Sequence, residues 1–231
     1  MIRKGMIFTI PLVLAMFAMS AYGWFNVEPG TQLPVHWGVD GQPDRYGSRF
    51  EAFLIMPLFM AGVLVLMAIL PFIDPRGRNL QRSRPAYLTV WVGTYVFITA
   101  VHAVVVMASL ELLPNGGADI MPQLVVAGSG LLMMLIGNVL GKARPNWFLG
   151  IRTPWTLSSD RAWDRTHRLT GRLMVLGGAV MVVAIFMLPP QLGFIVVAAG
   201  ALIPAVTGVI YSYFAWRDDP ERETASPEEV E

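Results

Sequence analysis

The sequence has no cysteine and few charged residues. Its 231 residues include no Cys, and 14% of them are charged. The absence of Cys excludes disulfides, thiolate metal sites and Cys nucleophiles. Soluble domains carry about 25% charged residues, so this composition excludes an ordinary soluble domain. A hydrophobic content of 55% also excludes a disordered chain and indicates a membrane protein.

Six apolar stretches are each long enough to cross a bilayer. A hydrocarbon core of ~30 Å requires about 20 apolar residues in a helix. The fifth stretch is short, so its helix is predicted to begin earlier, at Ser158 or Ser159, with Asp160 in the first turn. We predict an all-α integral membrane protein, a bundle of six transmembrane helices. The stretches comprise residues 6–25, 52–73, 86–110, 122–141, 173–188 and 192–216.

The first stretch has a second interpretation. Arg3 and Lys4 precede it, and residues 18–20 loosely resemble a cleavage site, as in a signal peptide. The apolar run continues through Trp24 and Phe25, however, and these residues are typical of the aromatic belt at a membrane surface. We therefore expect the first stretch to be retained as a span.

Basic residues are distributed very unequally between the loops. Six spans place both termini on one side, and a cytoplasmic position for them puts 15 of the 17 Lys and Arg residues inside, leaving Arg45 and Arg49 outside. The positive-inside rule therefore predicts cytoplasmic N and C termini. The net charge of +1 is then a cancellation of about +5 inside against −4 outside. We predict contact with membrane lipids and no direct contact with nucleic acid.

The chain divides into three parts on this topology. Residues 1–73 form an N-terminal two-helix region with an extracellular loop at 26–51. Residues 86–216 form a four-helix region with a cytoplasmic loop at 141–172. Residues 217–231 are acidic and lack apolar periodicity, which predicts a disordered cytoplasmic tail.

The extracellular loop contains a possible metal site. Asp40-Gly41 predicts a type I′ turn, in which both central residues take positive φ, within a small hairpin or compact loop. Imidazole and carboxylate groups of His36, Asp40 and Asp44 suit several divalent ions. The interpretation we favour is that these side chains cap turns and pair with Arg45 or Arg49, because no second cluster of ligands accompanies them. We predict no metal and no cofactor.

The third span carries one ionisable residue, His102. Tyr95, Thr99 and His102 follow helical spacing and share one face. An ionisable group in a span suggests a function such as proton transfer. The alternative is a neutral His102 that forms a hydrogen bond across a helix interface, since no predicted span supplies a carboxylate partner.

The cytoplasmic loop 141–172 is aromatic and interrupted by Pro and Gly. Such a backbone is expected to lie at the membrane surface or to fold back against the helices. Arg144 and Arg152 can meet lipid phosphates, and Arg161, Arg165 and Arg168 give the following helix a basic surface. The loop is therefore either a lipid anchor or a binding or gating element.

The same loop carries a long motif. The residues are Asn138, Pro145, Asn146, Trp147, Phe148, Gly150, Arg152, Thr153, Pro154, Trp155, Thr156, Ser158, Trp163, His167 and Arg168. This motif resembles the signature of the SdpI family, multispan bacterial immunity proteins that protect a producer from its own toxic peptide. The outer loop, through Pro34, His36, Gly41, Asp44 and Tyr46, is similar to a short N-terminal domain of uncharacterised function often found in the same proteins.

The resemblance implies a non-enzymatic protein of the bacterial cytoplasmic membrane. It implies resistance to a secreted membrane-active toxin peptide outside the cell. It also implies, at least for the founding system, that a transcriptional repressor or other cytoplasmic protein is held at the membrane inside.

The alternative class is a small membrane transporter or a metal-dependent membrane enzyme. Its reactive sets would be His36 with the two outer Asp residues, or His167 with Asp160 and Asp164. Neither set has a nucleophile with an adjacent base and oxyanion donors. The spans also lack the paired charges expected for ion coupling.

Overall fold

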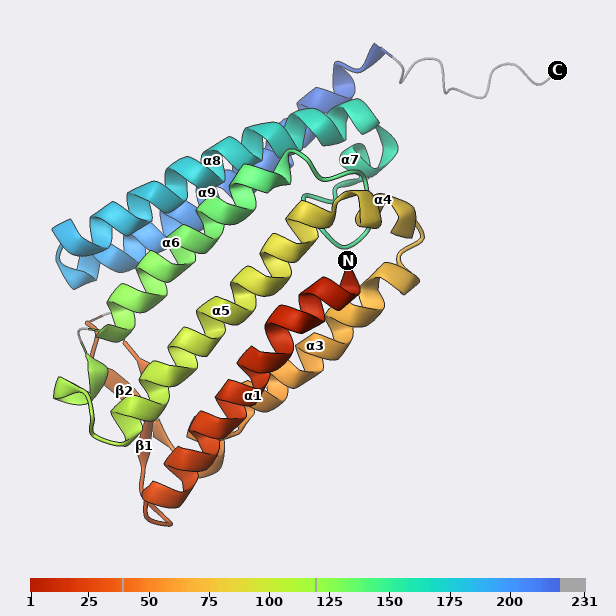
Figure 1. Cartoon of the computed structure of the whole chain (residues 1–231). Coiled ribbons are helices and arrows are strands. Elements are labelled where there is room, and N and C mark those ends of the chain that lie inside the picture. Colours follow the sequence, from red (N-terminus) through yellow and green to blue (C-terminus); the bar gives the residue numbers. More distant parts are fainter. Residues whose placement is uncertain (39, 119, 221–231) are drawn as a thin grey trace.

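The structure, a computed structural model, describes residues 1–38, 40–118 and 120–220. Six long helices run side by side, and a two-stranded hairpin lies at one end of them (Figure 1). The six helices are long and apolar enough to cross a membrane, which confirms the predicted integral membrane bundle. The helices are α1 Ile2–Asn26, α2 Arg49–Phe53, α3 Ile55–Ile73, α4 Gly77–Arg82, α5 Arg84–Ser109, α6 Ile120–Leu140, α7 Pro154–Ser158, α8 Asp160–Met187 and α9 Pro190–Arg217, with a 3₁₀ turn at Pro114–Gly117 and strands β1 Leu33–Trp37 and β2 Pro43–Gly47.

Helices α2, α7 and α8 begin at residues whose side chains cap them. The Oγ of Ser159 accepts a hydrogen bond from the Ala162 amide at 2.9 Å, so α8 begins before its apolar part, as predicted. The second span consists of α2 and α3, which are joined at Leu54. Of the expected acidic tail, residues 221–231 lie outside the described part of the chain.

The two ends of the bundle differ in structure. We call the end that carries β1 and β2 the hairpin end, and the opposite end, with α4, α7 and the segment 141–159, the loop end. The start of α1 and the end of α9 both lie at the loop end, as an even number of spans requires (Figure 1). The division of the chain into regions 1–73 and 86–216 stays a prediction.

The helices pack in two groups. In one, α1 contacts α3 and α5, and in the other α6 and α9 both pack on α8. Helices α6 and α8 approach closely because glycines face each other: a Cβ on Gly130 would lie 2.6 Å from the Gly178 carbonyl oxygen, and one on Gly137 would lie 2.6 Å from that of Gly171. In lipid the hydrophobic effect does not drive helices together. Small residues at helix contacts let the backbones approach closely, so that van der Waals packing can stabilise the contact.

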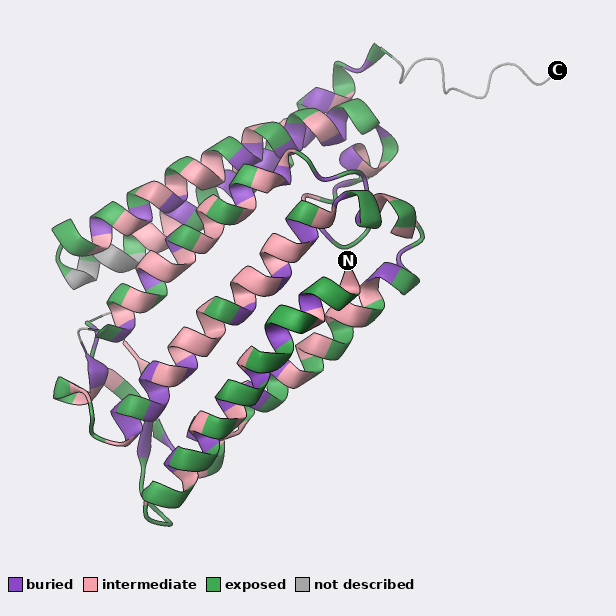
Figure 2. Cartoon of the chain, viewed as in Figure 1, coloured by how far each residue is buried: buried purple, intermediate pink, exposed green. Residues whose placement is uncertain are grey.

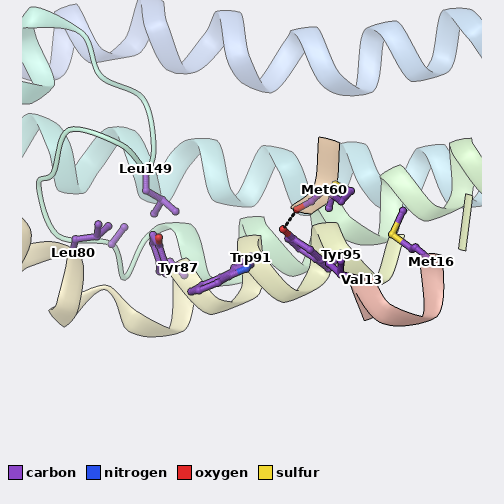
Figure 3. Close-up of a cluster of buried hydrophobic side chains, with 10 residues drawn as sticks. Val13, Met16, Met60, Leu80, Tyr87, Trp91, Tyr95 and Leu149 are labelled. Carbon is purple, nitrogen blue, oxygen red and sulfur yellow. Dashed lines mark hydrogen bonds between the residues drawn. The ribbon is translucent and has the colours of Figure 1, made fainter. Parts of the chain in front are cut away.

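Large side chains fill the space between α1, α3 and α5. Trp91 and Tyr95 are almost fully buried, and the Tyr95 hydroxyl donates a hydrogen bond of 2.6 Å to the Met60 carbonyl oxygen, which joins α5 to α3 (Figure 3). Trp91 meets the edge of Tyr87 with ring centroids 5.8 Å apart. This cluster reaches the loop end, where it includes Leu80 and Leu149.

The outward faces of the span helices are apolar. Exposed and half-buried residues alternate with buried ones along each long helix (Figure 2). Phe8, Val180 and Ile203 are each more than half exposed, as are many other large apolar side chains on the spans. An apolar surface of this extent is expected to face lipid chains.

The outer loop folds as a hairpin. Strands β1 and β2 are antiparallel. Gly41 has φ +80°, but the predicted type I′ turn includes residue 39, which lies outside the described residues, so the turn type stays a prediction. The amide of Gly41 donates to the Gly38 carbonyl oxygen, and the amide of Gly38 donates to that of Gln42, and these two bonds close the tip of the hairpin. A Cβ on Gly41 would lie 2.7 Å from the Ala118 carbonyl oxygen, so the loop tip packs on the link between α5 and α6.

Candidate functional site

The predicted polar residues of the hairpin make two separate contacts. His36 Nδ1 lies 2.5 Å from Asp44 Oδ1, and the Asp40 carboxylate accepts a hydrogen bond from the Gln42 amide at 3.0 Å. The first contact is a pair across the hairpin and the second caps its turn. The expected pairing of these acids with Arg45 or Arg49 is wrong, because Arg45 pairs with Glu51 and Arg49 donates to the carbonyl oxygens of Trp24 and Val27.

The other outer-loop residues divide into buried and exposed ones. Pro34 and Gly41 are buried, and Tyr46, two residues after Asp44 on β2, is exposed. Within the described ranges, no group of three His, Asp or Glu residues could hold a metal ion. The hairpin therefore presents a polar and aromatic surface formed by His36, Asp44 and Tyr46.

His102 joins three helices near the hairpin end. Its Nε2 lies 2.9 Å from Ser20 Oγ, and that hydroxyl donates to the Phe53 carbonyl oxygen at 2.5 Å. Since the hydroxyl has one proton, Nε2 is the donor in the first bond. The bonds link α5, α1 and α2, which confirms the predicted hydrogen bond of His102 across a helix interface.

At the loop end, Asn146 organises the segment before α7. It is fully buried, and its Oδ1 accepts hydrogen bonds from the amides of Phe148 and Leu149 at 2.9 and 2.6 Å. Its Nδ2 donates to the carbonyl oxygens of Arg144 and Leu149. One amide side chain thereby satisfies four backbone groups of an irregular segment that has no regular partner.

His167 fixes the next part of the loop on α8. Its Nδ1 donates to the Trp163 carbonyl oxygen at 2.7 Å, and its Nε2 accepts from the Ile151 amide at 3.0 Å, so the ring is neutral. The ring stacks on Trp163 with centroids 4.0 Å apart. Gly150 lies against it with φ +110°, and a Cβ there would be 2.1 Å from Nε2.

Thr153 and Thr156 close the loop at α7. Each hydroxyl accepts a hydrogen bond from the other residue's amide, which forms a capping box at the start of α7. The Thr153 hydroxyl also lies 2.9 Å from the Ser212 hydroxyl of α9. Trp155 meets Tyr213 of α9 edge-on, with ring centroids 5.2 Å apart. Pro154 and Ser158 are exposed on the same turn of helix.

The loop also docks on the link between α3 and α5, through residues that the sequence analysis missed. Asp74 accepts from the Trp147 amide at 3.2 Å, Asn79 donates to the Pro145 carbonyl oxygen at 2.9 Å, and Ser83 accepts from the Arg144 amide at 2.7 Å. The only sequence signal for these contacts is that polar residues lie in a short link between two spans. Their partners are more than 60 positions away.

A few signature residues lie on the surface. Trp147 is 44% exposed and Phe148 36% exposed, and the Arg152 guanidinium donates to the Trp147 carbonyl oxygen at 2.8 Å. We call Trp147, Phe148 and Arg152 the exposed aromatic edge. Asn138 is exposed at the end of α6, and Arg168 pairs with Asp164 at 2.5 Å, as the i, i+4 spacing predicts.

At the loop end, the buried side chains hold the loop backbone in position. Both ring nitrogens of His167 are occupied by backbone groups, and Asp164 is paired with an arginine. The predicted reactive set of His167, Asp160 and Asp164 is therefore not brought together as a reactive centre. Most buried signature residues hold the loop against α8 and α9.

Two family models and one curated protein match the chain. The model described as the SdpI/YfhL protein family matches residues 142–212, which include nearly all of the loop, all of α8 and most of α9. A second model, described as a domain of unknown function (DUF1648), matches residues 11–61, which include the hairpin. The immunity protein SdpI of Bacillus subtilis (strain 168) is 22% identical over 192 residues, which span 80% of this chain and 84% of that protein. No solved structure matches the chain.

Proposed function

This chain belongs to the SdpI family, and we propose that it protects the cell that produces it from a secreted, membrane-active peptide. The observation that carries this proposal is the similarity to an immunity protein over most of both chains. The similarity extends over the hairpin and the loop, the two parts of this multi-pass membrane protein that lie outside the long helices.

The proposed orientation has the hairpin outside the bacterial cytoplasmic membrane and the loop end inside. The distribution of arginine supports it. Ten of the 15 arginines, such as Arg76 and Arg161, belong to the segments 74–85 and 141–172 at the loop end, whereas the hairpin region holds Arg45 and Arg49. A secreted peptide would then meet the hairpin first.

A protective role needs no catalysis. The transporter and enzyme alternatives gain no support from the structure. In the part of the chain that is described, the only His in a span outside the loop end is His102, and it is engaged with Ser20. We therefore treat the protein as a binding or shielding protein.

We assign contact with the peptide to the surface formed by His36, Asp44 and Tyr46. These side chains are exposed and their backbone is fixed by the strand pairing, so they can be replaced with little effect on the fold. A pair of charged or polar groups beside an aromatic ring suits a peptide that carries both apolar and basic side chains.

Survival of a toxin-sensitive host tests both parts of the proposal. Expression of the intact chain should raise the toxin concentration that the host survives. A host that expresses the His36→Ala/Tyr46→Ala variant should survive only a lower concentration than one with the intact chain, although the variant is equally abundant in membranes. Gln42→Ala, at the exposed loop tip of the same hairpin, is the matched control and should protect like the intact chain. Unchanged toxin sensitivity with the intact chain present would reject the immunity function. Full protection by the double variant would reject only the hairpin contact.

A second function, recruitment of a cytoplasmic regulator, is supported by the exposed aromatic edge. Trp147 is 44% exposed and Phe148 36% exposed, on a loop whose backbone is fixed from inside by Asn146. Preformed aromatic surfaces are typical anchors of protein interfaces. A transcriptional regulator tagged for fluorescence should move to membranes with the intact chain and stay in the cytoplasm with Trp147→Ala/Phe148→Ala.

A further inference from the structure

A basic hollow lies at the loop end, apart from the exposed aromatic edge. Its volume is about 660 Å³, and it is bounded by α4, the segment after α6 and the first turns of α8. Five arginines and two aspartates supply its charge, which gives a formal excess of three positive charges. The lining residues are Asn79, Arg82, Arg144, Pro145, Asp160, Arg161, Asp164, Arg165 and Arg168.

Most of the guanidinium groups in the hollow have no partner. Arg168 pairs with Asp164. The side chains of Arg82, Arg144, Arg161 and Arg165 form no hydrogen bond or ion pair with any other residue in the described ranges. Four unpaired cations around one hollow repel one another, and an anion placed among them removes that repulsion.

The backbone around the hollow is fixed. Asn79 Nδ2 donates to the Pro145 carbonyl oxygen at 2.9 Å, and the Arg144 amide donates to Ser83 Oγ at 2.7 Å. These two bonds join α4 and the start of α5 to the loop segment that forms the opposite wall. The arginines therefore start from fixed positions, which lowers the entropy lost when they bind a ligand.

The position of the hollow along α8 indicates the source of the anion. The apolar part of α8 begins at Leu173, five residues after Arg168 and eight after Arg165, or about 8 and 12 Å along the helix axis. The headgroup layer of a bilayer extends about 5–8 Å beyond the hydrocarbon core. Arginine side chains reach several ångströms toward it, so the side of the hollow formed by Arg165 and Arg168 meets the depth of lipid phosphates.

An apolar groove on the neighbouring helices favours a lipid over a soluble anion. A groove of about 600 Å³ runs between α5 and α6. Its first residue on α5 is Leu88, about 6 Å along the axis from Arg84, where α5 begins beside the hollow. On α6 it is lined by Leu131 and Leu135. Phospholipid headgroup and chain sites commonly combine a basic pocket with an apolar surface.

From these observations we propose that the hollow binds the phosphate of an anionic phospholipid. The guanidinium groups of Arg82, Arg144, Arg161 and Arg165 hold the phosphate oxygens, since Arg matches phosphate geometry with paired N–H donors. The bound lipid then joins α8 to α4, and α4 contacts α3 and α5 of the other packing group. This proposal is independent of the immunity function.

Lipid titration of the full chain in a non-ionic detergent tests the proposal. Native mass spectrometry counts the phosphatidylglycerol or phosphatidylcholine molecules retained. Each arginine contributes about fivefold to affinity, so Arg161→Gln/Arg165→Gln should weaken phosphatidylglycerol binding about 25-fold. Arg78→Gln, on an exposed arginine of α4 outside the hollow, should bind like the intact chain. Arg161→Lys/Arg165→Lys keeps both charges but lacks the paired donors, so it should bind more tightly than the Gln variant and less tightly than the intact chain.

Three outcomes would overturn the assignment. Equal retention of phosphatidylglycerol by the intact chain and the Gln double variant would remove the hollow as its site. Equal retention of phosphatidylcholine by the intact chain would show that the anionic headgroup is not recognised. Displacement of phosphatidylglycerol by inorganic phosphate, or by a soluble peptide with the sequence of residues 218–231, would assign the hollow to a soluble anion or an acidic polypeptide instead.

Discussion

Replacement of Gly150 by Ala tests how the loop is held on α8. Gly150 has φ +110°, and a Cβ at this position would lie 2.1 Å from Nε2 of His167. That nitrogen accepts the hydrogen bond from the Ile151 amide at 3.0 Å. His167 is buried and stacked on Trp163, so its ring cannot move aside without loss of that bond.

The expected magnitude follows from two separate costs. An L side chain at this φ costs about 1–3 kcal/mol in backbone strain. A displaced ring leaves the Ile151 amide and the ring nitrogen unpaired, which costs about 1–3 kcal/mol more. We expect Gly150→Ala to lower the free energy of unfolding by about 2–6 kcal/mol.

Two other glycines separate these costs. Gly30 also has positive φ, +88°, but a Cβ there has nothing within 4 Å, so Gly30→Ala should cost only the strain. Gly62 lies inside α3 with nothing within 4 Å of a Cβ and without positive φ. Gly62→Ala should be neutral or stabilising by up to about 1 kcal/mol.

The assay is thermal unfolding of the three variants in one detergent at one scan rate. The apparent unfolding temperature should fall most for Gly150→Ala, less for Gly30→Ala, and not at all for Gly62→Ala. An effect of Gly150→Ala no larger than that of Gly30→Ala would refute the role assigned to the contact with His167, since both variants carry the same kind of strain.

Three further variants test the packing. Asn146→Ala should destabilise the chain by about 2–4 kcal/mol, because the buried amides that its side chain accepts from lose their partner. Tyr95→Phe should cost about 1 kcal/mol through loss of the bond to Met60. Gly178→Ala should cost about 1–3 kcal/mol, because its Cβ would lie 2.3 Å from the Gly130 carbonyl oxygen and force α6 and α8 apart. Each is measured as a shift in apparent unfolding temperature.

The control for Asn146→Ala is an asparagine at an exposed position. Asn138→Ala replaces an exposed Asn at the end of α6 and should leave the unfolding temperature unchanged. An effect of Asn146→Ala as small as that of Asn138→Ala would contradict the organising role of Asn146. A Gly178→Ala variant as stable as the intact chain would mean that α6 and α8 can separate without cost.

The spans could be predicted because their signals are local. Length and hydropathy of a segment decide whether it can remain in lipid, and neither depends on its neighbours. The start of α8 was predicted for the same reason, since Ser159 caps the helix through an amide three residues away. The packing of the hairpin tip could not be predicted, because Gly41 lies against Ala118, which belongs to the link between α5 and α6 and is distant in the sequence.

The candidate site could be predicted only as a set of residues. The motif identified His167, Asn146 and Thr153, but chemistry alone leaves a histidine open to catalysis, metal binding or packing. The structure favours packing, because both ring nitrogens of His167 form hydrogen bonds with backbone groups. Trp163 and His167 are four residues apart on α8 and therefore share a face, and both are buried.

The sequence by itself determined that this chain is a six-span membrane protein with most of its basic residues at one end, because hydropathy and charge are sums over neighbouring residues. Only the tertiary structure decided which of those residues meet. Asp74, Asn79 and Ser83 bind a loop more than 60 positions away, and Arg82 of α4 comes to face Arg161 and Arg165 of α8 across one hollow. Such contacts depend on how separate helices pack, and no local pattern of residues encodes that arrangement.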